Sequence, residues 1–456
     1  MLKLFVLMVI VTLSMGLLVT DVRGISKSKG QPAIEDDLDV LDHYPEKEPT
    51  SAEDYYEQGM LLLARRMHQE AGGQFRKALE LDPGHVYSMV GLVAVSLRLD
   101  DMESAVDFSG KAIKIQPDSA PLRNLIGERW MANASFADRE KSRAEAEGRF
   151  KEAISLDPKF IPARVNLANL YLSMKKVDGA IGEYMAAIKI EPENPELRRE
   201  LAYIYLNTGE IDKGLQEAEK MVELSPENPV YRNGLGEIYM NQGQLEKAFR
   251  EFQQAVTLDP KHAHAYMNMG KVHLAQGSSD KAMEEFNKAL SHRPGYGEAY
   301  AGLGDAYLVK GMNREAAQEY EKAIGENAIK TLSIQGFASV HNNLAYIYCE
   351  EGRDLDTALS HAQKAIQVVP EHPGFADTLG WIYLKKGDYD EALKNLKAAA
   401  EAAPENPLIR YHLGAAYYKK GFKEQAITEL RKSISISDDF PGVEDAKRTL
   451  AELESR

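Results

Sequence analysis

Three histidines close together in the chain are the best candidates for metal chemistry. His262, His264 and His273 carry imidazole nitrogens, which are common ligands for transition metals. His262 falls in a turn between helical segments, and His273 takes a position that Tyr239 and Tyr307 hold in equivalent segments. We therefore interpret these histidines as turn and packing residues, and we predict no metal site and no cofactor.

No pattern in the chain predicts catalysis. The sequence has no phosphate-binding loop, no zinc-type cysteine spacing and no nucleophile elbow. Its single cysteine, Cys349, cannot form an intramolecular disulfide, and we interpret it as a small buried apolar residue. Two inserts, at 132–145 and 328–338, are too short to build a buried active site. We expect a protein that is not an enzyme.

A period of 34 residues organises most of the chain. Nine prolines mark it, with successive spacings of 34, 41, 34, 34, 34, 34, 76 and 34 residues: Pro83, Pro117, Pro158, Pro192, Pro226, Pro260, Pro294, Pro370 and Pro404. Small residues recur at fixed places within each unit, and larger apolar residues lie between them at helical spacing. Each unit therefore predicts two helices joined by a tight turn, stacked on the next unit.

Residues 229–262, with the sequence PVYRNGLGEIYMNQGQLEKAFREFQQAVTLDPKH, closely resemble a tetratricopeptide repeat. The resemblance implies an all-α fold, a right-handed α-solenoid of helix-turn-helix repeats. We count eleven repeats. Repeats 1–8 are expected over 52–330 and repeats 9–11 over 338–440, and 441–456 is expected to form a C-terminal capping helix.

Two places break the period. In the third repeat, Ala146 arrives seven residues late, and both helices there are expected to be longer. After Ala323 the expected proline is missing and AIKTLSIQGFA is inserted, so the array is expected either to bend there or to divide into 52–328 and 338–456.

The first helices of tetratricopeptide arrays line a concave groove, and the resemblance implies which side chains would face it. The predicted partner-binding residues are Asn166, Asn169, Arg199, Tyr203, Asn233, Asn268, Lys271, Asn342, Asn343, Tyr346, Asp377, Trp381, Lys385, Tyr411 and Tyr418. Asparagine can bond the backbone of an extended peptide, and tyrosine and tryptophan are frequent interface anchors. Two alternatives stay open for Trp381: an exposed anchor in the groove, or packing against the first helix of the next repeat.

Two recognition schemes of the family match this chain poorly. The lysine, arginine and asparagine set that grips a C-terminal carboxylate is not reproduced. The asparagine ladder that holds extended peptides is matched at Asn166, Asn268 and Asn343 but is interrupted in the other repeats. A role as a cytosolic chaperone adaptor is therefore not favoured.

The N-terminus predicts export. Lys3 precedes seventeen uncharged residues, Leu4–Thr20, and residues 1–24 are interpreted either as a cleaved secretory signal or as an uncleaved membrane anchor. Residues 25–51 carry a net charge of −4 and three prolines, which favours a disordered acidic linker. The whole chain carries a net charge of −15 and no basic stripe, so nucleic acid is not expected as a partner.

These features predict a binding scaffold for a protein or peptide partner. Residues 376–421 look like the C-terminal repeats of bacterial envelope tetratricopeptide proteins, which implies a periplasmic protein, or one anchored in the inner membrane and facing the periplasm. Membrane association would run through residues 4–20. The alternatives are an accessory subunit of an exopolysaccharide or glycosyltransferase complex and a factor for assembling a secretion machine.

Overall fold

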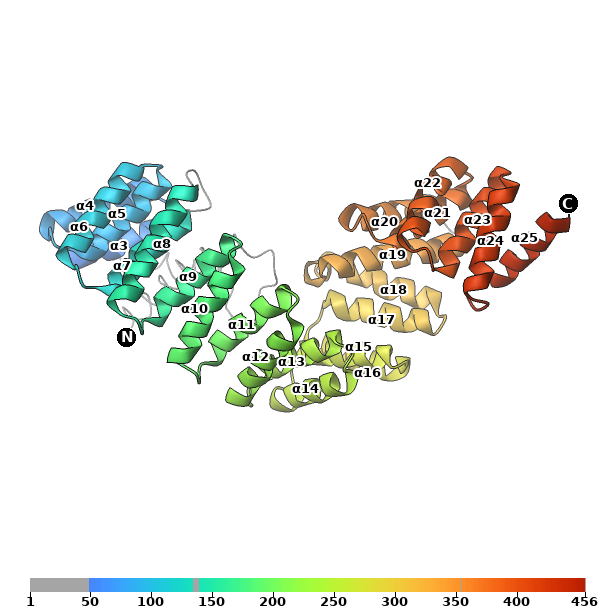
Figure 1. The fold of residues 1–456 in the computed structure, drawn as a ribbon, viewed down its shortest axis with the longest axis horizontal. Coiled ribbons are helices and arrows are strands. Elements are labelled where there is room, and N and C mark those ends of the chain that lie inside the picture. Colours follow the sequence, from blue (N-terminus) through green and yellow to red (C-terminus); the bar gives the residue numbers. More distant parts are fainter. Residues whose placement is uncertain (1–48, 134–138, 353, 456) are drawn as a thin grey trace. The chain divides into compact units, whose positions relative to one another are not determined.

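The computed structural model describes residues 49–133, 139–352 and 354–455. Over these ranges the chain forms 23 α-helices and one short 3-10 helix, and no β-strand, which confirms the predicted all-helical repeat array. The helices follow one another as antiparallel hairpins (Figure 1). By their internal contacts they divide into two compact units, the first ending at Leu224 and the second beginning at Ser225.

The first unit holds five hairpins. Its helices are α3 (Ala52–Ala64), α4 (His68–Leu81), α5 (Val86–Arg98), α6 (Met102–Ile115), α7 (Ala120–Asn133), α8 (Arg139–Leu156), α9 (Ile161–Ser173), α10 (Val177–Ile190), α11 (Pro195–Asn207) and α12 (Ile211–Leu224).

The second unit holds six hairpins and a final helix. Its helices are α13 (Pro229–Asn241), α14 (Leu245–Leu258), α15 (Ala263–Ala275), α16 (Ser279–His292), α17 (Gly297–Val309), α18 (Asn313–Ala323), η1 (Ile329–Thr331), α19 (Ile334–Glu350), α20 (Leu355–Val368), α21 (Pro373–Lys386), α22 (Tyr389–Ala402), α23 (Pro407–Lys420), α24 (Lys423–Ile436) and α25 (Val443–Ser455).

Local sequence sets the helix ends. At the start of α13, the Asn228 side chain accepts hydrogen bonds from the backbone N–H groups of Val230 and Tyr231, and Pro229 occupies the first turn, where its missing N–H is not needed. At the end of α21, Gly387 adopts φ +84°, a left-handed conformation that glycine reaches without a steric penalty. The proline and glycine signals in the sequence thus act as start and stop points.

The two helices of a hairpin touch where a small residue meets a large ring. A Cβ placed on Gly236 of α13 would lie 2.5 Å from the Phe252 ring of α14, and one on Gly270 of α15 would lie 2.6 Å from Phe286 of α16. Both phenylalanines are fully buried. The period of small residues therefore exists because the helix backbones approach each other closely at these points.

A repeated arginine joins both helices of a hairpin to the turn before it. In the last repeat, Arg410 of α23 bonds Glu429 of α24 at 2.8 Å and the backbone carbonyl of Pro404 at 2.9 Å. The same trio of proline carbonyl, arginine and glutamate recurs at three other hairpins, through Arg164, Arg198 and Arg232. These pairs are largely shielded from water, so they hold the helices in register more firmly than surface pairs would.

The first insert accompanies a longer second helix. α8 has 18 residues where most other second helices have 14. α7 is described as far as Asn133 and residues 134–138 lie outside the described residues, so the expectation that α7 is longer as well stays a prediction. Four extra residues amount to about one helical turn, which keeps the buried face of α8 in register.

The second insert folds against the start of α17. The backbone N–H of Gly297 donates to Thr331 Oγ1 at 2.6 Å, and the backbone N–H of Ser333 donates to Glu298 Oε1 at 2.8 Å. The helices before and after the insert, α18 and α19, share one hydrophobic cluster that includes Tyr320. The division into compact units lies elsewhere, after α12, and not at this insert.

Residues on both sides of the division are small. α12 carries Ala218 at the position where α14 and α16 carry the phenylalanines Phe252 and Phe286. α13 carries Gly234, and no atom would lie within 4 Å of a Cβ placed there. Ala362 of α20 and Gly302 of α17 hold the same repeat positions away from the boundary, so these residues do not mark it in the sequence.

The first and last described helices, α3 and α25, close the two ends of the described array. At the C-terminal end, Ala446 and Leu453 of α25 are buried against the last hairpin. At the N-terminal end, Ser51 and Asp54 form a reciprocal capping box at the start of α3. The predicted signal or anchor at 1–24 and most of the predicted linker lie outside the described residues. Among the helices that are described, none is both long enough and apolar enough to cross a bilayer.

Candidate functional site

Mostly polar side chains join several first helices to the first helix of the next repeat, and we call these contacts the first-helix seam. In the first unit, Asn166 of α9 lies between two side chains of α7: its Nδ2 donates to Asn124 Oδ1 and to Glu128 Oε1, both at 2.9 Å. Asn124 Nδ2 donates to the same Glu128 oxygen at 2.9 Å. Burial raises the pKa of Glu128, and the Asn166 amide opposes that rise. The triad thus satisfies a carboxylate that is largely removed from water.

The same triad recurs in the second unit. Asn268 of α15 donates to Asn233 Oδ1 at 3.1 Å and to Glu237 Oε1 at 2.9 Å, and Asn233 also donates to Glu237 at 2.9 Å. Asn268 is 2% exposed and Asn233 is 6% exposed. The geometry repeats because residues four apart share one face of a helix, so Asn and Glu at that spacing both meet the next repeat.

Between α17 and α19 the seam uses a tyrosine. Asn343 donates to the Tyr320 hydroxyl at 2.9 Å, and that hydroxyl donates to Asp305 Oδ1 at 2.6 Å. Burial raises the pKa of Asp305, while the hydrogen bond from Tyr320 opposes the rise. This part of the seam therefore also ties a second helix, α18, into the network.

Near the C-terminal end the seam becomes aromatic. His412 of α23 bonds Asp377 of α21 at 2.9 Å and stacks on Trp381 with ring centroids 4.0 Å apart. Trp381 Nε1 donates to Glu350 at 2.7 Å, and Lys385 Nζ lies 4.7 Å from the centre of the indole ring. Trp381 is only 8% exposed. The exposed-anchor alternative for Trp381 is wrong, and packing against the next first helix is confirmed.

Two tyrosines connect the last repeat to the final helix. Tyr411 is buried, its ring packs against Gly442, and burial raises its pKa to about 12 with a smaller effect from Asp445. Tyr418 donates to Glu452 of α25 at 3.2 Å. The hydroxyl groups of both tyrosines therefore interact with side chains of the capping helix α25.

Several predicted groove residues are satisfied within the chain. The expectation that asparagines are free to hold a peptide backbone is wrong for Asn233 and Asn268, which are buried and bonded in the seam. Asp377 and Tyr411 are buried as well, so neither offers a free surface. Position on a first helix does not reveal whether the neighbouring repeat already uses the side chain.

The remaining predicted residues of the first unit lie at its surface. Tyr203 is 46% exposed, Arg199 is exposed and bonds Glu200 at 2.8 Å, and exposed Asn169 accepts a hydrogen bond from Tyr184 at 2.9 Å. The other predicted residues, apart from Asn166, belong to the second unit. The predicted set therefore forms two groups, one in each unit, and their role in binding stays a prediction.

One predicted residue of the second unit is not satisfied. Asn342 of α19 is half-buried, and its Oδ1 is buried without a hydrogen-bond partner among the described residues. One turn further on, Tyr346 is half-buried, and burial raises its pKa with smaller effects from Glu350 and Asp377. Lys271, by contrast, already lies 3.5 Å from Glu298. Among the predicted residues of this unit, Asn342 therefore offers a buried acceptor that lacks a donor.

The spacing of asparagine and glutamate in the sequence indicates the seam, but the prediction of groove residues did not use this spacing. Asn124 and Glu128 are separated by three residues, as are Asn233 and Glu237, and a further asparagine follows in the next first helix. Glu128 and Asn124 were not among the predicted site residues, although they form the centre of a triad.

The three histidines considered for a metal serve separate packing roles. His262 Nδ1 accepts a hydrogen bond from the Ala265 backbone and caps α15, His273 lies 4.9 Å from the Phe249 ring, and His264 lies 5.4 Å from the Tyr296 ring. Within the described ranges, no three metal-ligating side chains gather at one point. Cys349 is 3% exposed, and burial raises its pKa to about 11, so its thiol is not activated.

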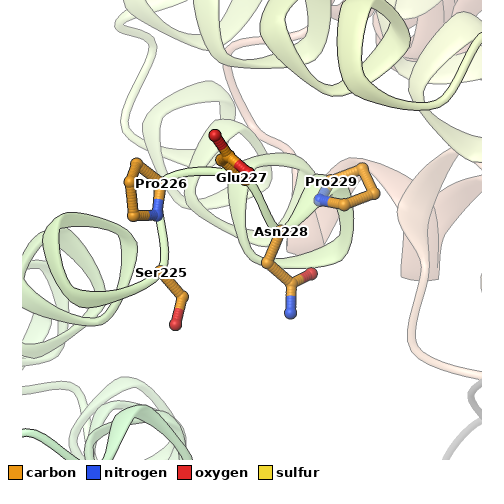
Figure 2. A pocket seen from close by; sticks show the side chains of 5 residues that line it. All are labelled: Ser225, Pro226, Glu227, Asn228 and Pro229. Carbon is orange, nitrogen blue, oxygen red and sulfur yellow. The ribbon is translucent and has the colours of Figure 1, made fainter.

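A surface pocket lies at the turn before α13. Figure 2 shows its lining residues, Ser225 to Pro229, on one short loop. Asn228 in this loop already caps α13, and the prolines shape the turn. A single loop with no convergent charged groups is a poor binding site, so we assign no function to this pocket.

Comparison with known families agrees with this architecture. A profile described as "TPR repeat" matches residues 168–209, 236–277 and 380–421, and two described as "Tetratricopeptide repeat" match 274–328 and 409–440. The chain is a tetratricopeptide repeat protein. Proteins with such repeats usually act as non-catalytic scaffolds for protein–protein interaction, so these repeats suggest protein partners. No curated protein matches the chain.

Several solved structures are similar. The APC/C hetero-tetramer Cut9–Hcn1 is 17% identical, with 88% of this chain and 96% of that chain covered and a TM-score of 0.48. A MamA structure is 28% identical over 37% of this chain and 92% of that one, with a TM-score of 0.33. YrrB, described as a TPR protein with an unusual peptide-binding site, is 25% identical over 43% and 97%, with a TM-score of 0.35.

Proposed function

We propose that the second unit binds an extended segment of a protein partner across α19, α21 and α23. The observation that carries this proposal is the buried, unpartnered Oδ1 of Asn342. A buried acceptor without a donor costs free energy, typically about 1–3 kcal/mol, which a bound peptide N–H would recover. The triads at Asn233 and Asn268 offer no such gain because their donors and acceptors are already paired.

The side chains around Asn342 suit a peptide. Tyr346, one turn away, is half-buried and offers a large contact surface with few rotatable bonds. Lys385 is exposed above the Trp381 ring, and Lys419 is exposed beside Tyr418. An extended segment would thus meet an acceptor, aromatic surface and two cations in succession.

Site-specific photo-crosslinking tests the location. Tyr346 and Lys385 are replaced one at a time by benzoylphenylalanine, with the exposed Ala398 of the second helix α22 as the matched control. We expect the same partner to be captured from positions 346 and 385 and not from 398. Equal capture at all three positions would contradict the proposal.

The affinity of the captured partner tests the residues. Asn342→Ala and Tyr346→Ala are each expected to weaken binding by roughly tenfold, the effect of losing one well-placed contact at an interface. Ala398→Ser should bind like the natural chain. Natural affinity in both groove variants would refute the role of α19.

We further propose that the chain is an exported scaffold of the bacterial cell envelope. The uncharged run of residues 4–20 and the envelope-like sequence of 376–421 support this. Sequencing the N-terminus of the mature protein tests it: a start at residue 25 indicates cleavage, and an intact N-terminus in the membrane fraction indicates an anchor. Full-length chain in the cytosol would refute export. An accessory role in an exopolysaccharide, glycosyltransferase or secretion complex is the alternative.

A further inference from the structure

Arg129 of α7 occupies a position that is apolar in most other repeats. The equivalent residues of other first helices are buried and aliphatic: Leu61, Val95, Leu170, Ile204, Val272, Ala306, Ile347, Ile382 and Ala416. A guanidinium at such a position loses hydration that an aliphatic side chain never had. Its presence is therefore stabilising only if some anionic or hydrogen-bonding group compensates it.

The described residues compensate Arg129 only in part. Its Nε is buried and bonds no group among them. The adjacent carboxylate of Glu128 already accepts amides from Asn124 and Asn166. Burial lowers the pKa of Arg129, and the charge on Glu128 opposes that shift. Arg129 is thus a shielded cation whose hydrogen-bonding capacity is not used up.

An aromatic surface lies beside Arg129, near the start of α3. α5 packs against both α3 and α7, so Tyr56 of α3 and Arg129 of α7 lie on the two helices that flank α5. Burial raises the pKa of Tyr56, and the charge on Arg129 opposes that rise. The Tyr56 ring lies 6.1 Å from Tyr87 and 5.5 Å from His85, and Tyr87 is 55% exposed. The first unit therefore presents a cation and an exposed ring close to where the chain leads into α3.

We propose that the acidic segment 35–48 docks on this surface of its own chain, with a carboxylate on Arg129 and apolar side chains on Tyr87. The segment carries seven acidic residues against one lysine, Lys47, which complements an unsatisfied cation. It also holds Leu38, Val40, Leu41 and Tyr44, which can cover an exposed ring.

The covalent connection favours this occupant over an acidic segment of another molecule. Residue 42 is joined to Thr50 by eight residues, which span about 26 Å when extended. Tyr56 lies only about 8 Å along the helix axis from Ser51. A short tether of this kind gives effective concentrations in the millimolar range, so even weak contacts suffice.

Photo-crosslinking in the full chain tests this proposal. Tyr44 is replaced by benzoylphenylalanine, which keeps an aromatic side chain there, and adducts are mapped by mass spectrometry. We expect an intramolecular adduct to α3, α5 or α7 whose yield falls roughly tenfold in Arg129→Leu, the factor for losing a charge-assisted bond. Arg76→Leu removes an exposed cation from the second helix α4 and should leave the yield unchanged.

A second variant keeps the test independent of how well Arg129→Leu folds. Replacing Asp36, Asp37 and Asp39 together by asparagine alters none of the described residues, and it should lower the yield to a similar extent. An adduct between two chains would identify a second copy as the occupant and overturn docking within one chain. No adduct in the purified chain that carries benzoylphenylalanine at position 44 and no other change, as expected if the occupant is an acidic partner, would overturn it too. Equal yields in all variants would also overturn it.

Discussion

Replacing Asn268 by alanine tests whether the first-helix seam stabilises the array. The change removes two hydrogen bonds, one to the neutral Asn233 Oδ1 and one to the carboxylate of Glu237. A neutral bond contributes about 1 kcal/mol and a bond to a charged acceptor about 2 kcal/mol. Since Asn268 is 2% exposed, water cannot replace the lost donor, and we expect the second unit to lose about 3 kcal/mol of unfolding free energy.

Urea unfolding with hydrogen exchange measures this loss. The denaturation midpoint reports the stability of the unit, and exchange of amides in α13 and α15 reports whether the loss begins at their contact. Asn166→Ala is the matched change in the first unit. Asn166 makes the same two bonds but is half-buried, so we expect a smaller loss there, about 1–2 kcal/mol.

A double-mutant cycle separates coupling from simple loss of packing. Asn233→Ala and Asn268→Ala break a shared bond, so the double variant should lose less than the sum of the single losses, by about 1 kcal/mol. Additive losses, or an Asn268→Ala chain as stable as the natural one, would refute the view that the triad joins the two repeats.

Two further predictions follow from the second unit. Burial, with the charge of His361, lowers the pKa of His341 to about 4, so the unfolded chain takes up a proton near pH 6.5 and the folded chain does not. Stability should therefore fall as pH drops from 6.5 towards 4, by about 2 kcal/mol between pH 7.5 and 5 in urea titrations, and His341→Gln should flatten that dependence. Gly236→Ala places a Cβ 2.5 Å from Phe252 and should destabilise α13 by about 1–3 kcal/mol, whereas Gly234→Ala meets no atom within 4 Å and should stabilise it by about 0.5–1 kcal/mol; thermal melts showing equal effects would contradict the packing argument.

The fold was predictable from sequence because its packing rules are local. Gly236 is small because Phe252 lies against it, and the same pair recurs at Gly270 and Phe286 one period later. Each repeat contacts its neighbours, so one period contains nearly all the information that fixes the fold. The insert after Ala323 departs from the period, and its docking on α17 was for that reason not foreseen.

The candidate site was predictable only as a face. Helical periodicity indicates that Asn233, Asn342 and Trp381 point towards neighbouring first helices, but it does not say which atoms those neighbours supply. Asn233 meets Glu237 and Asn268, whereas Asn342 Oδ1 meets no donor among the described residues. The difference depends on side chains about one full repeat away, and a single sequence does not reveal which of these pairs bond.

We use saturation of hydrogen bonds, more than position in the repeat, to separate structural polar residues from candidates for binding. A buried carboxylate bonded by two amides, such as Glu128, gains nothing from a ligand. A buried acceptor without a donor, such as Asn342 Oδ1, or a shielded guanidinium with an unused Nε, such as Arg129, gains from one. The two proposals rest on these unsaturated groups. They lie in different units, so binding at one site can be abolished by mutation while the other is retained.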